Sequence, residues 1–200
     1  RKRGAMAVKL PNPKYIPKPY EQMQYPGQRV QIDVKFVPKA CIVNQQESTQ
    51  WFQYTFLDEY SRFRYIEAFQ EHSTYSSTAF LRHVVKKFPY LIECVQTDNG
   101  AEFTNRLLPK GSDKPTPFEL ELKKLGIRHK LIRPYTPRHN GKVERSHRKD
   151  NEEFYASHRF YSFDDFKAQL AVRERAYNNF PMRPLSWRSP KQVLFASLNL

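Results

Sequence analysis

The chain has few cysteines and no long apolar run, and both absences narrow what it can be. Its 200 residues include two cysteines, Cys41 and Cys94, which form no CxxC pair. Isolated thiols argue against a disulfide scaffold and against a zinc site built from cysteine. No apolar segment reaches membrane-spanning length, and no apolar stretch follows the basic residues 1–3, as it would in a secretory signal. We therefore expect no membrane partner and a cytoplasmic, nucleoid-associated location.

Acidic residues are also scarce. The chain has 20 Asp and Glu against 34 Lys and Arg, which gives a formal net charge of +14. A folded protein with this balance usually binds a polyanion, most often nucleic acid; a ribosomal-type or simply soluble basic protein is the alternative. An anionic membrane surface is disfavoured, because no basic helix with a broad apolar face is present. With 39% hydrophobic residues the chain is expected to fold, as one domain with a small extension.

The distribution of proline divides the chain into three regions. Residues 1–28 are rich in Pro, Lys and Tyr, which disfavours helix and central strand, so we interpret them as an extended arm or linker. Residues 29–180 are expected to form the core. Residues 181–200 contain further prolines and form a C-terminal extension that either packs on the core or leaves it.

Hydrophobic periodicity within the core predicts alternating strands and helices. The predicted strands cover residues 29–37, 51–58, 62–69, 91–98 and 127–132. Helices are expected after the N-cap candidates Ser73 and Ser162, over 117–126 with Gly126 closing the helix, and from about Gly141 onward. No internal repeat is present. This order of elements predicts an α/β or α+β layer fold with one mixed sheet.

Three carboxylates stand out against the basic background. Asp33 lies inside the first strand, where Asp is disfavoured, and is either an ordinary solvent-facing residue or a functional one. Asp98 ends a strand before an Asn-Gly pair; this suits a turn, but strand carboxyl ends are also where α/β folds place their sites. Glu144 lies in a run of basic residues, where it either moderates a basic face or binds a cation.

The second interpretation of Glu144 requires the three acids to meet. If its helix lies beside the strands, the carboxylates repel one another and need a cation. Magnesium prefers oxygen ligands and is usually held by a few carboxylates together with substrate phosphates, and paired ions can activate an attacking oxygen and stabilise a leaving one. Basic residues on the same helix would then hold the DNA backbone; these are Lys142, Arg145, Arg148 and Lys149.

Four segments resemble, in order, the signature blocks of the retroviral-type integrase core, which occurs in DDE insertion-sequence transposases of bacteria and in retroviral integrases. They are "QIDVKF", "FLDEYSRFRY", "QTDNGAEF" and "YTPRHNGKVERSHR". The later segment "YNNFPMRPLSWRSPKQVL" resembles the end of that core in bacterial transposases. The resemblance covers residues 28–195. It implies a ribonuclease-H-like α/β fold with a central mixed five-stranded sheet flanked by helices, and Mg²⁺ or Mn²⁺ as cofactor.

Matched to these blocks, the catalytic and metal-binding triad of the family falls on Asp33, Asp98 and Glu144, with two ions expected once DNA is bound. The interval between Asp98 and Glu144 is longer than the best-known spacing of the family. We expect the excess in a surface loop at 107–117, since loop growth costs little closure entropy. The main rival for the third acid is Glu102.

Other matched positions have less specific expectations. Asp58 is expected to be structural, pairing with Arg62 or with a backbone amide, and the Asn99-Gly100 pair is expected to shape the turn after Asp98. Tyr135 either stacks on an end base or packs in the core. Capping alone would explain Asn140. The candidate DNA contacts are Arg138, His139, Asn140, Lys142, Arg145, Arg148 and Lys149.

Together these features predict the catalytic core of a transposase or integrase, which cuts a phosphodiester at an element end and joins the freed 3′-hydroxyl to target DNA. A ribonuclease-H-like nuclease is the first alternative, and the "YTPRHNGKVER" block argues against it. A non-catalytic DNA-binding module derived from a transposase is the second, and the intact triad argues against that. Chemistry on paired ends suggests a homo-oligomer. Because no helix-turn-helix or zinc finger is present, we expect end recognition to reside in a preceding region or in flanking parts.

Overall fold

A computed structural model of the chain describes residues 21–43, 46, 48–107, 114–132, 140–196 and 198. The strands are β1 (Val30–Phe36), β2 (Phe52–Asp58), β3 (Arg64–Phe69), β4 (Cys94–Thr97) and β5 (Arg128–Leu131). The helices are α1 (Thr74–Lys87), α2 (Pro117–Lys124), α3 (Gly141–Asp150), α4 (Phe163–Asn179) and α5 (Pro190–Ala196). A π-helical turn, Asn151–Tyr155, continues α3. Short 3₁₀ turns lie at Lys39–Cys41 and Arg183–Leu185.

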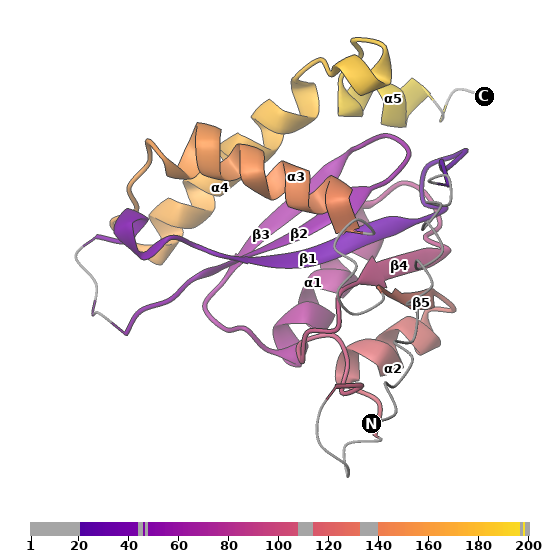
Figure 1. Cartoon of the computed structure of the whole chain (residues 1–200), viewed down its shortest axis with the longest axis horizontal. Coiled ribbons are helices and arrows are strands. Elements are labelled where there is room, and N and C mark those ends of the chain that lie inside the picture. Colours follow the sequence, from indigo (N-terminus) through magenta and orange to yellow (C-terminus); the bar gives the residue numbers. More distant parts are fainter. Residues whose placement is uncertain are drawn as a thin grey trace, which may run out of the picture.

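The strands form one mixed sheet in the order β3-β2-β1-β4-β5 (Figure 1). The first three strands are antiparallel neighbours, and β4 and β5 run parallel to β1. This is the five-stranded mixed sheet that the sequence predicts. Four of the helices begin close to their predicted starts, and Ser73 and Ser162 each accept a hydrogen bond from an amide in the first turn, as N-caps do. Gly126 has φ +69° and follows α2, so its backbone conformation suits glycine.

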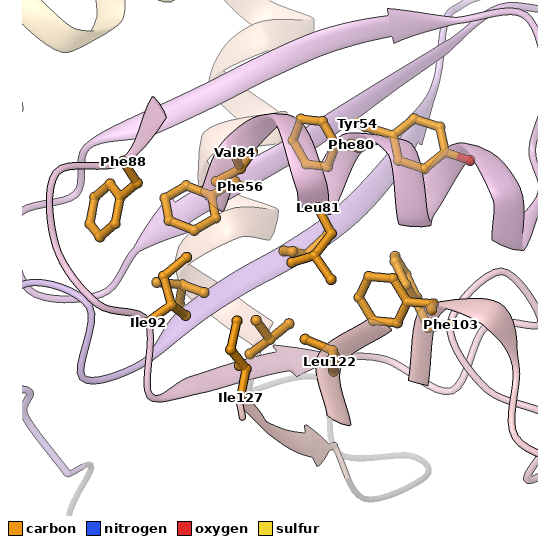
Figure 2. Packing of buried hydrophobic residues seen from close by; sticks show 14 of the residues in the cluster. Tyr54, Phe56, Phe80, Leu81, Val84, Phe88, Ile92, Phe103, Leu122 and Ile127 are labelled. Atoms are coloured by element: carbon orange, nitrogen blue, oxygen red, sulfur yellow. The ribbon is translucent and has the colours of Figure 1, made fainter. Parts of the chain in front are cut away.

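One face of the sheet carries the larger hydrophobic cluster. Figure 2 shows Phe80 and Leu81 of α1 lying against Tyr54 and Phe56 of β2. Phe103, Leu122 and Ile127 extend this cluster toward α2, and Leu194 of α5 also belongs to it; its labelled members are largely or fully buried. Burial of a large apolar side chain contributes about 1.5–3 kcal/mol. This face is therefore the main source of stability.

The opposite face is covered by α3, the π-helical turn and α4 (Figure 1). A second hydrophobic cluster lies there, formed among others by Trp51, Ile66, Phe160 and Phe166. The polar side of β1 therefore does not face solvent along its whole length: Gln31 is fully buried, whereas Phe36 on the apolar side is 55% exposed. Period-two alternation alone does not predict this arrangement, because it cannot show that helices cover both faces.

A buried ionic cluster fastens these helices to the sheet. The guanidinium of Arg64 donates two 2.8 Å hydrogen bonds to the Asp150 carboxylate, and both side chains are fully buried. Gln53 and Arg173 each donate a further bond of 2.9 Å to Asp150. The guanidinium also lies 3.8 Å from the centre of the Tyr177 ring. Strands β2 and β3 are thereby joined to α3 and α4 through buried ionic and hydrogen-bonded groups.

Segments on both sides of residues 29–180 also contact the core. The Gly27 amide donates to Asp58 at 2.9 Å, and a side chain at Gly27 would meet the Leu91 carbonyl oxygen, so glycine is required there. Tyr90 donates to the Leu194 carbonyl at 2.7 Å, which ties α5 to the core. Residues 1–20 of the predicted arm lie outside the described residues. No helix in the described part of the chain is long and apolar enough to cross a membrane.

Candidate active site

Asp33 and Asp98 lie on neighbouring parallel strands. Gln31 of β1 is opposite Gln96 of β4, so Asp33 and Asp98, each two residues further on, are at the same level of the sheet. Asp98 directly follows the last residue of β4, and its carboxylate accepts a 2.9 Å bond from the Gly100 amide. The sheet therefore places both acids next to each other, at the carboxyl end of β4.

The Asn99-Gly100 pair shapes the turn after Asp98. The Asn99 side chain donates to the Ile132 carbonyl at 2.9 Å, so the turn is fixed to the residue that follows β5. Phe103 and Thr104 donate their amides back to the Gly100 carbonyl. This turn therefore fixes the position of Asp98 at the end of β4.

Glu144 lies in the first turn of α3 and is solvent-exposed. Two contacts fix the start of this helix. The Val143 amide donates to the side-chain oxygen of Gln31 at 2.9 Å. The ammonium of Lys142 contacts the buried carboxylate of Glu59 at 3.0 Å. Because Gln31 and Asp33 are on the same strand, Glu144 is held on the face of β1 that bears Asp33.

The pKa directions of Asp98 and Glu144 both include an effect of the Asp33 charge. Burial raises the pKa of Asp98, and the nearby charges of Asp33 and Glu102 raise it further. Burial also raises the pKa of Glu144, again with a contribution from Asp33. Asp33 therefore acts on both of the other acids.

The described residues contain no group of three or more His, Cys, Asp or Glu side chains already arranged around a metal position. The donor chemistry nevertheless fits a hard divalent cation, since the candidate ligands are carboxylate oxygens that disfavour each other's charge. Asp33 and Asp98 are partly exposed and Glu144 is exposed, so all three are accessible from solvent.

His147 is a residue of this site that the sequence alone did not single out. Its Nδ1 lies 3.4 Å from the Asp33 carboxylate, and its Nε2 lies 2.9 Å from the Thr55 hydroxyl. Thr55 is the partner of Asp33 across β1 and β2. Its spacing could have identified it, because His147 comes three residues after Glu144 and therefore lies on the same side of the helix.

Glu102, the rival third acid, has a partner of its own. Its carboxylate lies 2.9 Å from Nε2 of His72, and its side chain is 8% exposed. The hydrogen bond to Glu102 is the main reason that the pKa of His72 is raised. A side chain at Gly100 would meet this carboxylate, which would then have to move. Glu102 is thus close enough to Asp98 to affect its pKa, but its own carboxylate is paired with His72.

The basic residues of α3 have different surroundings. Arg145 and Arg148 are exposed. Lys142 is directed to Glu59; burial, opposed by the Glu59 charge, lowers the pKa of its ammonium to about 8. Lys149 lies 3.4 Å from Glu153. Of the predicted DNA contacts on this helix, Arg145 and Arg148 are therefore the most available to a ligand.

The remaining candidates near α3 divide between the described and undescribed parts of the chain. Asn140 is at the N-cap position of α3 but makes no side-chain capping bond, and its buried side-chain oxygen has no partner among the described residues. Capping through its side chain therefore does not explain this residue. Tyr135, Arg138 and His139 lie outside the described residues.

Asp58 has a structural role. Its buried carboxylate accepts bonds from the Gly27 amide at 2.9 Å and from the amide and hydroxyl of Ser61 at 2.7 and 2.6 Å. These contacts close the turn between β2 and β3, where Arg62 adopts a positive φ of 62°. The backbone-amide partners that we expected for Asp58 are confirmed.

The five-stranded mixed sheet with helices on both faces defines a ribonuclease-H-like fold. Two family models, each described as an integrase core domain, match residues 24–137 and 125–190. The chain therefore belongs to the integrase core domain family. A candidate integrase, ORF3 of Spiroplasma virus SpV1-C74, is 31% identical over 125 residues, which is 59% of this chain and 33% of that protein.

Solved integrase structures share the fold. The simian T-cell lymphotropic virus intasome in complex with PP2A regulatory subunit B56 gamma matches with a TM-score of 0.67 and 18% identity, over 92% of this chain and 60% of the other. The HTLV-2 integrase catalytic core with magnesium, in its trimeric form, matches with a TM-score of 0.59 and 14% identity, over 84% of this chain and 97% of the other. The BIV integrase catalytic core matches with a TM-score of 0.58 and 18% identity, over 86% of this chain and 97% of the other. The chain thus spans a third of the viral relative and 60% of the intasome chain.

Proposed function

We propose that this chain is a catalytic core that cuts and joins DNA strands in integration or transposition, with Asp33, Asp98 and Glu144 as its catalytic acids. The observation that carries the proposal is geometric: Asp33 and Asp98 lie at the same level of neighbouring parallel strands, and the start of the helix that carries Glu144 is bonded to Gln31 of the same strand as Asp33. Three acids from a strand, a strand end and a helix share one site in a chain of net charge +14. Because the three negative charges repel one another, binding of a cation between them is favourable.

The three acids would hold Mg²⁺ or Mn²⁺, as two ions when DNA is bound. Such ions supply positive charge that activates an attacking oxygen and stabilises the leaving oxygen of a phosphodiester. The chain's own residues hold the ligands in place: His147 and the β1–β2 pairing orient Asp33, and the Gly100 amide orients Asp98. Gln31 fixes the start of the helix that carries Glu144.

DNA is the proposed substrate, with element ends cut and target DNA joined. The exposed guanidiniums of Arg145 and Arg148 lie on the same helix as Glu144 and can contact phosphates. Among the similar structures, one is part of an intasome, which supports DNA as the substrate, and another is a magnesium complex, which supports the metal. HTLV-2 cores in trimeric and dimeric forms support a homo-oligomer as the active state. We place the protein in the cytoplasm, associated with the nucleoid.

The test compares the Asp33→Asn variant with the wild-type chain on a labelled duplex that carries a free 3′-hydroxyl end. Nicking and strand transfer with Mn²⁺ or Mg²⁺ should both fall by more than about a hundredfold in the variant, while DNA affinity measured in EDTA stays equal or rises. Asp164→Asn is the matched control, since that exposed acid lies on α4. Wild-type protein that binds DNA but never cuts it would contradict the proposal. Nicking without strand transfer would favour the nuclease alternative.

A further inference from the structure

The segment that follows α4 combines exposed aromatic rings with positive charge. Trp187 is 71% exposed and Phe180 is 59% exposed, although both are large apolar side chains. Residues 175–200 contain no Asp or Glu. The basic residues here are all exposed: Arg175 in the last part of α4, and Arg183, Arg188 and Lys191 beyond it. A surface of this composition is complementary to a polyanion.

The backbone that presents Trp187 is unusual. Ser186 has φ 54° and Trp187 has φ 62°, so two consecutive residues with side chains adopt the left-handed conformation. Glycine or asparagine is the ordinary choice at such positions. Strain of this kind persists where the surrounding structure enforces it, and it is concentrated at functional sites.

Hydrogen bonds within residues 182–188, which we call the Trp187 loop, enforce this conformation. The Trp187 amide donates to the Met182 carbonyl at 3.0 Å, and the Ser186 amide donates to the Arg183 carbonyl at 3.1 Å. Met182 and Arg188 close the loop as a bridge, with the Met182 amide bonded to the Arg188 carbonyl at 3.0 Å. Leu185 is buried and anchors the loop. The backbone at Trp187 is therefore fixed, and most of the indole faces solvent.

The segment that leads into the Trp187 loop adjoins the helix of the candidate active site. The ammonium of Lys149, on α3, lies 5.4 Å from the centre of the Phe180 ring. Arg145 and Arg148 are exposed on the same helix. Basic surface is thus present on α3 and again beyond Phe180, so a DNA strand that contacts α3 has further cationic surface within reach.

We propose that the Trp187 loop binds a single-stranded stretch of DNA, with Trp187 stacked on an unpaired base and Arg183 and Arg188 contacting its phosphates. Proteins bind single strands by combining an aromatic platform with a cationic surface. This inference rests on the proposed function and extends it, because it assigns a DNA contact outside the carboxylate site. A protein partner is less well matched, since the loop offers one ring among charges rather than a broad apolar patch.

The first experiment uses fluorescence from Trp187. The chain has two tryptophans, and the other, Trp51, is 3% exposed. Titration of the wild-type chain with a short oligothymidylate in EDTA should quench the exposed indole, because a stacked base lies directly on it. The Trp187→Phe variant retains the buried Trp51 and should show little quenching. Equal quenching in both proteins would overturn the proposal.

The second experiment measures affinity in EDTA, so it does not depend on cutting. Trp187→Ala should weaken oligothymidylate binding about tenfold and duplex binding less than about twofold. Trp187→Tyr should keep most of the single-strand affinity, because it retains an aromatic ring. Arg183→Gln and Arg188→Gln should each reduce the salt slope for the single strand by about 0.7. Lys124→Gln, on α2 at the other end of the molecule (Figure 1), should leave the slope unchanged.

A glycine variant separates loss of the ligand contact from loss of the fold. Trp187→Gly relieves the positive-φ strain, so the urea midpoint should rise while single-strand affinity falls about tenfold. Unchanged single-strand affinity in Trp187→Ala would overturn the inference, and a simultaneous change in sedimentation would instead assign the loop to contact with a second copy of the chain. If the wild type binds the single strand through Trp187 but never cuts duplex, only the proposed function fails.

Discussion

The Val143 amide donates a 2.9 Å hydrogen bond to the side-chain oxygen of Gln31, and both side chains are fully buried. The same Gln31 donates from its amide nitrogen to the Glu59 carboxylate at 2.9 Å. Gln31 precedes Asp33 on β1 by two residues, and Val143 immediately precedes Glu144 on α3. The strand that carries one candidate acid is therefore bonded directly to the helix that carries another.

Replacing Gln31 should loosen this connection. Gln31→Leu leaves the Val143 amide and one contact of Glu59 without a partner, so the free energy of unfolding should fall by about 1–3 kcal/mol. Strand transfer should fall further than DNA affinity, because Glu144 loses its fixed position while Arg145 and Arg148 remain. Urea unfolding and the transfer assay measure the two effects. Gln70→Leu, at an exposed position, should change neither by much. Full activity in Gln31→Leu would show that α3 is positioned by other contacts.

Acid should weaken the protein through Asp150. Burial alone would raise its pKa, but Arg64, Gln53 and Arg173 hold the pKa of this carboxyl down from 3.8 to about 2. Because the folded-state pKa is the lower one, the ionised carboxylate contributes about 2 kcal/mol of stability. This stability is complete above about pH 5 and is lost as the pH falls toward 2.

The Asp150→Asn variant tests this linkage. It leaves the buried Arg64 without its ionic partner and should lower the free energy of unfolding by about 3–5 kcal/mol near neutral pH. The difference from wild type should shrink as the pH falls from 5 toward 2, since the wild-type carboxyl then becomes neutral as well. Urea unfolding across this pH range measures it. Asp164→Asn removes an exposed acid and should give a difference near zero throughout.

Of the surface loop predicted at 107–117, residues 108–113 lie outside the described residues, whereas Thr116 and Pro117 form the start of α2. Thr116 caps α2: its hydroxyl oxygen accepts from the Glu119 amide at 3.2 Å, and the Glu119 carboxylate accepts from the Thr116 amide at 2.8 Å. Thr116→Ala should therefore cost about 1–2 kcal/mol in urea unfolding. Partial shortening within residues 108–113 should change stability by only about 0.5 kcal/mol. Loss of cooperative unfolding on shortening would show that this segment packs in the core.

Local signals accounted for most of the secondary structure. Apolar residues alternate along β1, and Ser73 and Ser162 cap their helices as predicted. The helix α5 was not predicted, because its prolines suggested an irregular tail. A local signal for it did exist: Ser189 and Gln192 bond reciprocally as a capping box, with Pro190 at the first helical position, where proline is favoured.

The polar interior could not be derived in the same way. Gln53 and Thr55 alternate with apolar residues on β2 and suggest a solvent-facing side, yet both are fully buried. Their partners come from distant parts of the chain, as with Asp150, which lies 97 positions after Gln53. Periodicity identifies which residues share a face, but only the folded arrangement shows what covers that face. The pairing of His147 with Asp33 belongs to the same class of information.

Glu144 has two possible roles that differ in their consequences. If it only moderates the charge of α3, Glu144→Gln should tighten DNA binding slightly and leave cutting intact. If it binds metal, the amide is a much poorer ligand for magnesium than the carboxylate. The exposed position of Glu144 makes the substitution structurally mild, so stability should change by less than about 0.5 kcal/mol in either case.

We predict the second outcome: Glu144→Gln should lower nicking and strand transfer together by more than about a hundredfold, because one metal site serves both steps. DNA affinity in EDTA should stay equal or rise, since Arg145 and Arg148 remain. Glu152→Gln, at an exposed acid just beyond α3, is the control for charge alone and should keep full activity. Glu102→Gln disturbs the contact with His72 and should retain substantially more activity than Glu144→Gln. If Glu102→Gln abolishes cutting while Glu144→Gln preserves it, Glu102 is the third catalytic acid.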